Sequence, residues 1–433
     1  MTPLVIENRP AISPSPWTGV ALVFLFMLIN FADKAVIGLA SVPIMHELGL
    51  SHTQFGLLGS AFFWLFSLSG VVGGFLANRL NTKTLMLVMG LIWAAALLGM
   101  SATSSFMALL IGRVVLGAAE GPAFPVALHA VYKWFADRSR ALPTSVVASG
   151  AAFGTGIVAP LITWIIVHYG WHAAFGTLGV AGLVWACLWF LLAAEGPATQ
   201  SAAVEAVSSS PIPYRQLLLS RTAVGVYLGG FAAYWVIALN IVWLANYLVK
   251  GAHLAPARAA WVIALPSAMQ MMLAPSCAYL SQVLSRRGYS SRVSRGLLSA
   301  ACVVIAGVSM ACLPLLNMGA LEILLIGLSF SIGSVFFTLG STLIGEIAPA
   351  NQRGAMLGIT NSIHTVAGLC APFAMGLIVD IGLDPMEGFR TGFLYAGTLV
   401  TVLGLLAATL INPEHDLQHF RERLYLGTAT ETP

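Results

Sequence analysis

Charge is what this sequence lacks. Only 8% of its 433 residues are Asp, Glu, Lys or Arg, against roughly 25% in soluble chains. Apolar residues make up 58%, and the mean hydropathy is +0.88. So few charges cannot cover a water-facing surface of this size, which excludes a soluble enzyme and a disordered chain. The pI of 8.9 reflects scarce charge and not a basic face, so no nucleic-acid partner is expected.

Cysteine is scarce too, and no catalytic or metal-binding pattern is present. The five cysteines have neither metal-ligand spacing nor a disulfide framework, and they fall within apolar runs as packing residues. The histidines are scattered, without a His-Glu-x-x-His spacing. We considered a membrane enzyme, but no nucleophile with a base is in place. The sequence therefore predicts no enzyme, no metal and no cofactor.

Unbroken apolar runs of about 20 residues are abundant instead. A helix needs this length to cross a roughly 30 Å hydrocarbon core, whereas barrel strands would alternate apolar and polar residues. The short start of the chain leads directly into a full-length run, so no cleavable signal peptide is expected. The sequence predicts an all-α membrane protein with twelve transmembrane helices, near 17–40, 55–77, 84–101, 107–131, 142–167, 173–194, 223–248, 259–281, 297–316, 321–344, 355–379 and 391–411.

An even number of crossings puts both termini on one side of the bilayer. Fifteen Lys and Arg residues fall on that side, and only Lys250, Arg258 and Arg390 fall on the other. Because cationic loops resist translocation, the termini should be cytoplasmic. We expect a monomer in the cell membrane, the inner membrane of a bacterium.

The two halves of the chain repeat the same features in the same order. Arg140 precedes Pro160 and a Gly-Trp-His-Ala-Ala-Phe run at 170–175, while Arg353 precedes Pro372 and a Gly-Phe-Arg-Thr-Gly-Phe run at 388–393. Gly and Pro are common in membrane helices, but four matched features favour a duplication. Such repeats are typical of transporters, whose substrate site lies between the halves. The predicted division is 1–194, a cytoplasmic linker at 195–222, and 223–433.

Four charged residues lie well inside the predicted spans: Asp33 and Lys34 in the first, Arg113 and Glu120 in the fourth. An ionisable group in the bilayer costs at least about 2.5–3.5 kcal/mol, so it marks a functional site by default. The alternative is a structural ion pair that joins the two helices. Two acids and two bases in two spans favour function.

The helical rise suggests how these charges pair. At 1.5 Å per residue, Asp33 and Arg113 lie at similar depth, while Glu120 lies about 10 Å deeper on the same face of its helix as Arg113. We expect Asp33 to pair with Arg113, and Lys34 to reach Glu120. A substrate carboxylate that takes Lys34 would leave Glu120 without a partner, and Glu120 would then bind a proton. Asp33 would do the same if the substrate takes Arg113.

Several motifs resemble the anion:cation symporter family of the major facilitator superfamily along essentially the whole chain. They are Asn30-Phe31-Ala32-Asp33-Lys34, Arg113-x-x-x-Gly117-x-x-Glu120-Gly121-Pro122, Lys133-Trp134-Phe135 with Arg138-x-Arg140, and Ile347-Ala348-Pro349. The resemblance implies a secondary active transporter that imports a small organic anion with protons by alternating access. It also implies that Asp33 and Glu120 carry protons and that Lys34 binds the carboxylate.

The sequence departs from the family at the expected pocket. Lys34 replaces the usual Arg, a planar fork, with a point charge. Phe66 and Gly70 stand where sugar-acid members have Tyr and Gln, so a hydroxyl and an amide are missing. A heavily hydroxylated substrate is therefore disfavoured, and an aromatic or short aliphatic carboxylate is expected.

Further polar and aromatic residues in the spans are candidates to line the substrate site: Asn30, Trp64, Tyr234, Asn240 and Asn361. Asn30 lies one turn before Lys34 on the same helix face. The two other asparagines could equally bridge helices by hydrogen bonds. A proton-coupled exporter of lipophilic compounds remains an alternative function, although two cations in the membrane argue for an anion. A sensor would need an output domain, which the short tails do not provide.

The cytoplasmic loops carry a family gating pattern, to which we assign Asn78, Arg79, Lys83, Arg138 and Arg140. Asn78 stands where the family has Asp, so it cannot supply the negative charge of the loop network. We therefore expect a weak outward-facing lock.

Replacing Asn78 by Asp should restore that lock and shift accessibility towards the outside. Labelling of a single introduced cysteine from each side of the membrane measures the shift. An unchanged labelling ratio would count against a gating role for Asn78.

Overall fold

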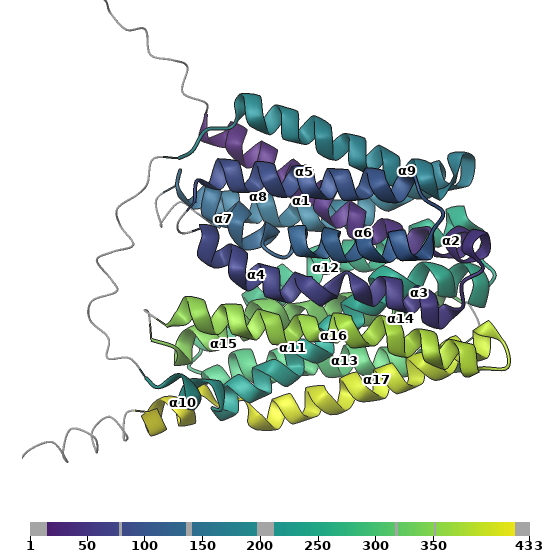
Figure 1. Cartoon of the computed structure of the whole chain (residues 1–433). Helices are drawn as coiled ribbons and strands as arrows, with labels where there is room; N and C mark the ends of the chain where they lie inside the picture. Colours follow the sequence, from purple (N-terminus) through teal and green to yellow (C-terminus); the bar gives the residue numbers. More distant parts are fainter. Residues whose placement is uncertain are drawn as a thin grey trace, which may run out of the picture.

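The computed structural model describes residues 15–77, 80–135, 141–196, 212–316, 319–349 and 352–420, and the regular elements among them are helices (Figure 1). The α-helices are α1 (Pro16–Leu39), α2 (Ser41–Leu48), α3 (His52–Ala61), α4 (Phe63–Ala77), α5 (Thr82–Ser101), α6 (Phe106–Glu120), α7 (Ala123–Tyr132), α8 (Ala141–Ala152), α9 (Val158–Leu192), α10 (Tyr214–Leu218), α11 (Arg221–Asn246), α12 (Pro256–Arg286), α13 (Leu298–Cys312), α14 (Ala320–Ser331), α15 (Val335–Ile347), α16 (Arg353–Ile381) and α17 (Pro385–Leu410). Short segments of other helix types are η2 (Phe153–Ile157), η5 (Tyr247–Gly251), η6 (Arg292–Leu297), η7 (Leu313–Leu315) and η8 (Ile332–Ser334).

Eleven helical segments of the described residues are long and apolar enough to cross a membrane. The longest, Leu142–Leu192, has 51 residues. At 1.5 Å per residue it measures about 75 Å, far more than a hydrocarbon core of about 30 Å. Gly170 breaks it with a φ of 84°, a backbone conformation that favours glycine. The segment therefore holds two crossings, and the prediction of twelve transmembrane helices is confirmed.

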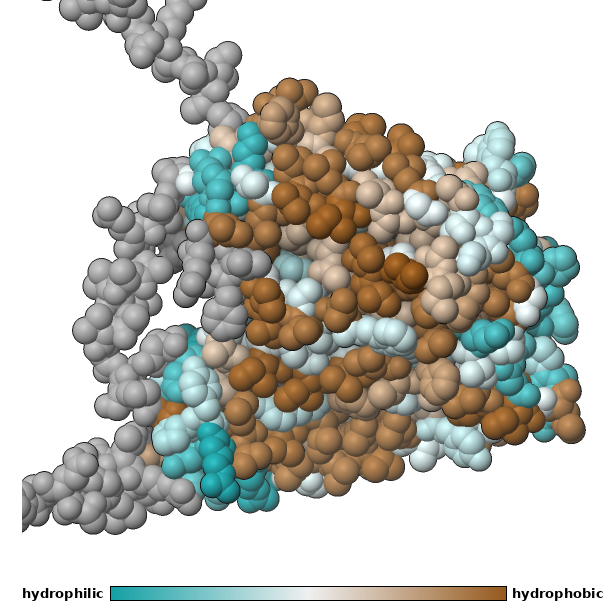
Figure 2. Space-filling model, in the orientation of Figure 1, coloured by the Kyte–Doolittle hydropathy of each residue, from teal (hydrophilic) through white to brown (hydrophobic). Residues whose placement is uncertain are grey.

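An apolar belt covers the middle of the face seen in Figure 2, and polar side chains gather at the two ends of the bundle. Leu68, Leu161 and Val180 are each more than half exposed on this belt. Such a surface would be unfavourable in water but faces acyl chains in a bilayer. Both ends of the described chain lie at one end of the bundle (Figure 1). We call this the terminal end, and the opposite one the far end.

The two halves have matching helix caps at the terminal end. The Glu195 carboxylate, just after α9, accepts hydrogen bonds from the backbone N–H groups of residues 82–83, where α5 begins. The Glu414 carboxylate, just after α17, accepts hydrogen bonds from the backbone N–H groups of residues 291–292, where η6 begins. A carboxylate at a helix N-terminus is favourable because the first amides lack helical partners. The repeat seen in the sequence thus has a counterpart in structure.

Each described end of the predicted linker is bound to its own half. Lys133 contacts Glu195, which fastens the first linker residue to the first half. The Gln352 side chain bonds the backbone N–H and carbonyl of Ile212, at 2.9 and 2.7 Å, which fastens the other end to the second half. The rest of the linker lies outside the described residues, so the predicted domain boundaries stay a prediction.

The halves meet along a seam in which α3 and α4 pack against α16. Small side chains and backbone atoms predominate, so the helices approach closely. From the far end inwards, the paired residues are Gly56 with Pro372, Ser60 with Phe373, Phe63 with Gly368, and Ser67 with Thr365. Towards the terminal end, a methyl group on Gly358 or Gly354 would meet nothing within 4 Å. The seam is therefore closed at the far end and ends near Thr365.

Replacing Glu195 by Gln should destabilise the protein, because the terminal cap loses its charge. Partial burial raises the pKa of Glu195, but hydrogen bonds from Lys133, Lys83 and Thr82 outweigh it and hold that pKa below its usual value. The stabilisation is therefore present above the unfolded carboxylate pKa of about 4.3 and is lost as the pH falls below it. We expect a loss of about 1.5–3 kcal/mol at pH 7, measured by thermal unfolding in detergent.

The same difference should shrink as the pH falls through the lowered pKa of Glu195, below which both proteins carry a neutral group. Equal stability of the two proteins at pH 7 would contradict this role of Glu195. Glu414→Gln tests the repeat, since it should show a similar loss.

Candidate functional site

Two glycines bring the helix with Glu120 close to the second span. A methyl group on Gly117 would overlap the Phe62 carbonyl, and one on Gly121 would overlap the Phe66 carbonyl. The Gly-Pro step at 121–122 interrupts the helix after α6, because proline has no N–H to donate. Glu120 therefore lies at the end of α6, inside the first half.

Lys34 and Glu120 form the ion pair predicted from the sequence. Lys34 Nζ lies 2.9 Å from Glu120 Oε2, and the side chains are 7% and 0% exposed. Asn30 supports the pair, since its Oδ1 accepts a hydrogen bond of 2.5 Å from Lys34 Nζ. The ammonium also lies 4.5 Å from the ring centre of Phe31 and 5.5 Å from that of Phe66, within cation–π range. The cation is thus held by one carboxylate, one amide and a shell of aromatic rings.

The predicted ion pair between Asp33 and Arg113 is wrong for the described residues. Arg113 instead places its guanidinium 4.7 Å from the Phe62 ring centre, and its Nε donates to the Leu58 carbonyl over 3.5 Å. Both Asp33 carboxylate oxygens and Arg113 Nη1 are buried without a hydrogen-bond partner among the described atoms. The helical rise gave the two residues the same depth, but the packing of Arg113 on Phe62 turns its side chain away.

All four intramembrane charges lie in one cluster. Asp33 interacts electrostatically with Glu120, Lys34 and Arg113. Their exposed fractions are 0% for Asp33, 6% for Lys34, and 1% for Arg113 and Glu120. The structure thus brings the predicted residues together in a buried site of zero net charge. Both Asp33 oxygens, Glu120 Oε1 and Arg113 Nη1 have no partner among the described atoms, whereas Glu120 Oε2 is paired with Lys34.

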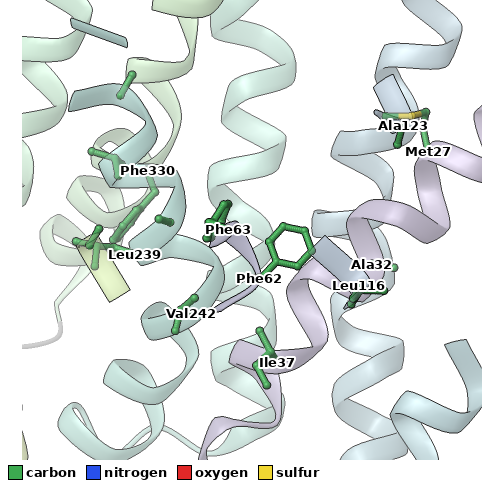
Figure 3. Close-up of a cluster of buried hydrophobic side chains, with 14 of the residues drawn as sticks. Met27, Ala32, Ile37, Phe62, Phe63, Leu116, Ala123, Leu239, Val242 and Phe330 are labelled. Atoms are coloured by element: carbon green, nitrogen blue, oxygen red, sulfur yellow. The ribbon is translucent and has the colours of Figure 1, made fainter. Parts of the chain in front are cut away.

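Consecutive phenylalanines connect this cluster to the second half. Phe62 points towards the helices that carry Ala32 and Leu116, and Phe63 points towards those that carry Leu239 and Val242 (Figure 3). The Phe63 ring meets the ring of Tyr234 edge to face, with centres 5.8 Å apart.

Tyr234 completes this connection from α11, because it also interacts electrostatically with Glu120. Tyr234 is therefore a residue of the second half that interacts with the cluster, as predicted for a residue that lines the site.

Trp64 does not face the site, which corrects the sequence prediction. It is 45% exposed, and Leu68 and Val72, one and two turns along the same helix face, are 62% and 49% exposed. These residues belong to the apolar belt. The sequence shows Trp64 beside Phe62 and Phe63, but the rotation of α4 is set by its packing on α6 and α16.

The two asparagines of the second half are less directly placed. Asn240 is half-buried in α11, and among the described residues it forms no hydrogen bond with the charged cluster. Asn361 is exposed, one turn from Thr365 towards the terminal end. It lies where the seam of closely paired residues has ended.

Of the predicted gating residues, Asn78, Arg79, Arg138 and Arg140 lie outside the described residues. Lys83 is described: its backbone N–H donates to Glu195, and its ammonium lies 5.8 Å from the ring centre of Phe190. Lys83 thus contacts its own half, and the gating assignment stays a prediction.

Sequence analysis missed a buried carboxylate outside the charged cluster. Glu322 is 0% exposed and accepts a hydrogen bond from the Tyr247 hydroxyl, inside the second half. Its position at the edge of a predicted span concealed it, because a residue there could equally face water. Asp380, at the end of another span, was missed for the same reason.

Replacing Lys34 by Met should destabilise the protein by about 3–5 kcal/mol, because Glu120 would be left as an uncompensated buried charge. The double variant Lys34→Met with Glu120→Gln should recover most of that loss. Thermal unfolding in detergent measures both. The matched control, Lys250→Met at an exposed position, should stay within about 0.5 kcal/mol. A double variant no more stable than Lys34→Met would show that the pair does not act as a unit.

Comparison with known proteins identifies the family. The model of the Major Facilitator Superfamily matches residues 22–333 and 226–424, and so extends over both halves. Among solved structures, a bacterial homolog of the human lysosomal transporter Spinster has a TM-score of 0.75 and 18% identity, covering 90% of this chain and 95% of that one. A D-xylose-proton symporter has a TM-score of 0.73 and 15% identity, covering 92% and 98%. These structures share the fold.

Several relatives in sequence are named as transporters of organic anions. The D-galactonate transporter of Escherichia coli O6:H1 is 25% identical, over 90% of this chain and 94% of the relative. The probable galactarate/D-glucarate transporter of Bacillus subtilis is 25% identical, over 84% and 86%. The probable sulfoacetate transporter of Cupriavidus necator is 27% identical, over 90% and 92%. The named relatives support the resemblance to the anion:cation symporter family. The chain belongs to the major facilitator superfamily and is a membrane transporter rather than an enzyme.

Proposed function

We propose that this transporter imports a small carboxylate together with protons. The observation that carries the proposal is the buried cluster of two acids and two bases, in which Asp33 and Arg113 have unpartnered polar atoms. Buried polar groups without partners are costly and rare in folded proteins. A carboxylate ligand would supply acceptors for Arg113, and protons would neutralise Asp33. The site is thus incomplete without an anion and a proton.

The pair of Lys34 and Glu120 links the two events. An incoming carboxylate would compete with Glu120 for Lys34, whose Nζ lies 2.9 Å from Glu120 Oε2. Once displaced, Glu120 would be an isolated anion in a dry site, and taking up a proton is the least costly relief. Protonated Glu120 and a substrate bound to Lys34 leave the cluster neutral again, so the halves can rearrange around it.

Tyr234 couples the cluster to the second half. Its ring packs on Phe63, and both lie next to the place where Glu120 changes charge. Asn30 orients Lys34, and Asn361 is exposed near the end of the seam. We assign substrate contacts to Lys34, Arg113, Asn30, Tyr234 and Asn361, and proton binding to Asp33 and Glu120.

The substrate we favour is an aromatic or short aliphatic carboxylate. The groups recorded around the Lys34 ammonium are phenyl rings together with Asn30 and Glu120. The nearby hydroxyls of Ser67 and Thr365 are bonded to each other. A sugar acid needs a partner for each hydroxyl, and such partners are few in this shell. The named relatives carry sugar acids or sulfoacetate, so this chain would differ from the former in its pocket.

The proposed setting is a bacterial inner membrane with both termini in the cytoplasm, as the distribution of basic residues favours. The terminal end of the bundle is then cytoplasmic, and the far end external. The protein would act as a monomer.

A proton-coupled exporter of lipophilic compounds is the second candidate. The aromatic shell around Lys34 favours it, because apolar compounds would pack well there. The two buried cations Lys34 and Arg113 favour an anion instead, since a neutral guest would leave Arg113 Nη1 without an acceptor.

Uptake into proteoliposomes tests the proposal. With an imposed pH gradient, the protein should accumulate labelled benzoate-type or short aliphatic carboxylates and discriminate against galactonate. Glu120→Gln should keep substrate exchange between the two sides but lose at least tenfold in gradient-driven accumulation, because it cannot bind the coupling proton. Glu322→Gln is the matched control, an equally buried carboxylate outside the cluster, and should keep accumulation.

Gradient-driven accumulation that persists in Glu120→Gln would remove Glu120 from the mechanism. Export of lipophilic dyes without carboxylate uptake would favour the second candidate.

A further inference from the structure

A polar contact between the halves closes the far end of the seam. Asp380, at the end of α16, accepts hydrogen bonds from the backbone N–H groups of His52 and Thr53, at 3.0 and 2.7 Å. The His52 ring contacts the same carboxylate, with Nδ1 2.8 Å from Oδ1. All three donors belong to the first half, and the acceptor belongs to the second.

The donors are the amides that α3 cannot satisfy within its own half. Ser51 and Gln54 form a capping box, in which each side chain bonds the backbone N–H of the other. This arrangement leaves the amides of His52 and Thr53, and Asp380 takes both. A carboxylate at a helix N-terminus also interacts favourably with the helix dipole. The cap of α3 is therefore completed only when the two halves touch.

The contact lies at the rim of a closely packed surface. Just inside it, a methyl group on Gly376 would overlap the His52 carbonyl, and one on Gly56 would overlap the Pro372 carbonyl. The side chains of His52 and Asp380 are 21% and 28% exposed. Water can therefore reach the contact and replace its partners when the halves part. A fully buried carboxylate would be costly to separate from its donors, and a fully exposed one would stabilise the closed far end only slightly.

The opposite end of the seam has no equivalent contact among the described residues. After Thr365, α16 runs on past Asn361 and Gly358, of which the first is exposed and the second faces open space. Among the described residues of this seam, the halves are thus fastened at the far end and not at the terminal end, as alternating access requires of one of its two forms.

We propose that Asp380 is a gating residue, which holds the far end closed by capping α3 across the interface and must release it for the far end to open. The contact makes no direct use of the charged cluster. The proposal rests on the chain being a transporter and does not depend on proton coupling or on the substrate. Its consequence is that Asp380 sets the balance between the two access states.

Replacing Asp380 by Asn should shift that balance, because each of the two carboxylate oxygens accepts a backbone N–H and asparagine offers only one acceptor oxygen. Spin labels at His46 and Leu383, which are exposed at the far end on the two halves, report the opening by double electron–electron resonance. The five native cysteines are first replaced. We expect the fraction of molecules with the longer distance to rise about tenfold, the factor that charge-assisted hydrogen bonds of this kind are worth.

Asp384→Asn is the matched control. Asp384 lies at the same end, but its carboxylate caps α17 within the second half by accepting the Glu387 N–H at 2.8 Å. This cap uses one oxygen, which asparagine retains, so the distance distribution should stay that of the parent. His52→Ala removes one of three donors and should give a smaller shift than Asp380→Asn.

A second readout covers the case that Asp380→Asn is poorly folded. Ser60→Cys places a thiol below the closed surface, at a position 1% exposed. In the His52→Ala background it should react at least threefold faster with a membrane-impermeant maleimide applied from the far side. Unchanged distances in Asp380→Asn, or an Asp384→Asn shift of equal size, would overturn the proposal. Neither outcome would bear on the uptake assay of Glu120→Gln, so the two proposals fail separately.

Discussion

The ion pair between Lys34 and Glu120 is the interaction on which the functional site depends. It places two opposite charges 2.9 Å apart in a region where neither could stand alone. The close approach of α6 to the second span, which glycines at 117 and 121 permit, brings Glu120 within reach. Once that pair is fixed, Asn30 and the aromatic rings follow as its surroundings. The remaining two charges, Asp33 and Arg113, are then left with unpartnered atoms, and on these atoms the proposal of a bound ligand rests.

The location of the cluster within one half has a mechanical meaning. The first half holds all four charges, Asp33, Lys34, Arg113 and Glu120. From the second half, Tyr234 interacts with Glu120. A change of charge at Glu120 therefore does not break an ion pair between the halves. It changes the electrostatic environment of Tyr234, whose ring packs against Phe63 at the interface. The interface itself is built from small residues and a few hydrogen bonds, which can separate at low cost.

The sequence was sufficient for some of this and insufficient for the rest, for physical reasons. Hydropathy identified the twelve crossings, because every crossing must satisfy its backbone within an apolar segment. Charge inside those segments identified the cluster, since few ionisable residues tolerate that environment. The helical rise gave the depth of Lys34 and Glu120 well enough to predict their pair. The rise along a helix does not give the direction in which a side chain points about the helix axis. For this reason the predictions for Trp64 and for the Asp33–Arg113 pair were wrong.

Rotation depends on contacts that no single segment contains. Arg113 turns towards Phe62 because two spans approach at a glycine, and Trp64 turns outwards because other residues of α4 pack inwards. The same holds for Asp380, which looks like an ordinary helix end until α3 lies beside it. Residues at the edges of spans are the hardest to interpret, because water, lipid and protein are all within their reach.

The two fastened ends of the linker, Glu195 on one bundle and Ile212 on the other, bear on how motion is shared. Since each end is tied to its own bundle, a tilt of one bundle need not be transmitted through the polypeptide that joins them. Communication has to pass across the non-covalent surface instead. The linker then keeps the two halves in one polypeptide, while the side chains in contact between the halves coordinate their motion.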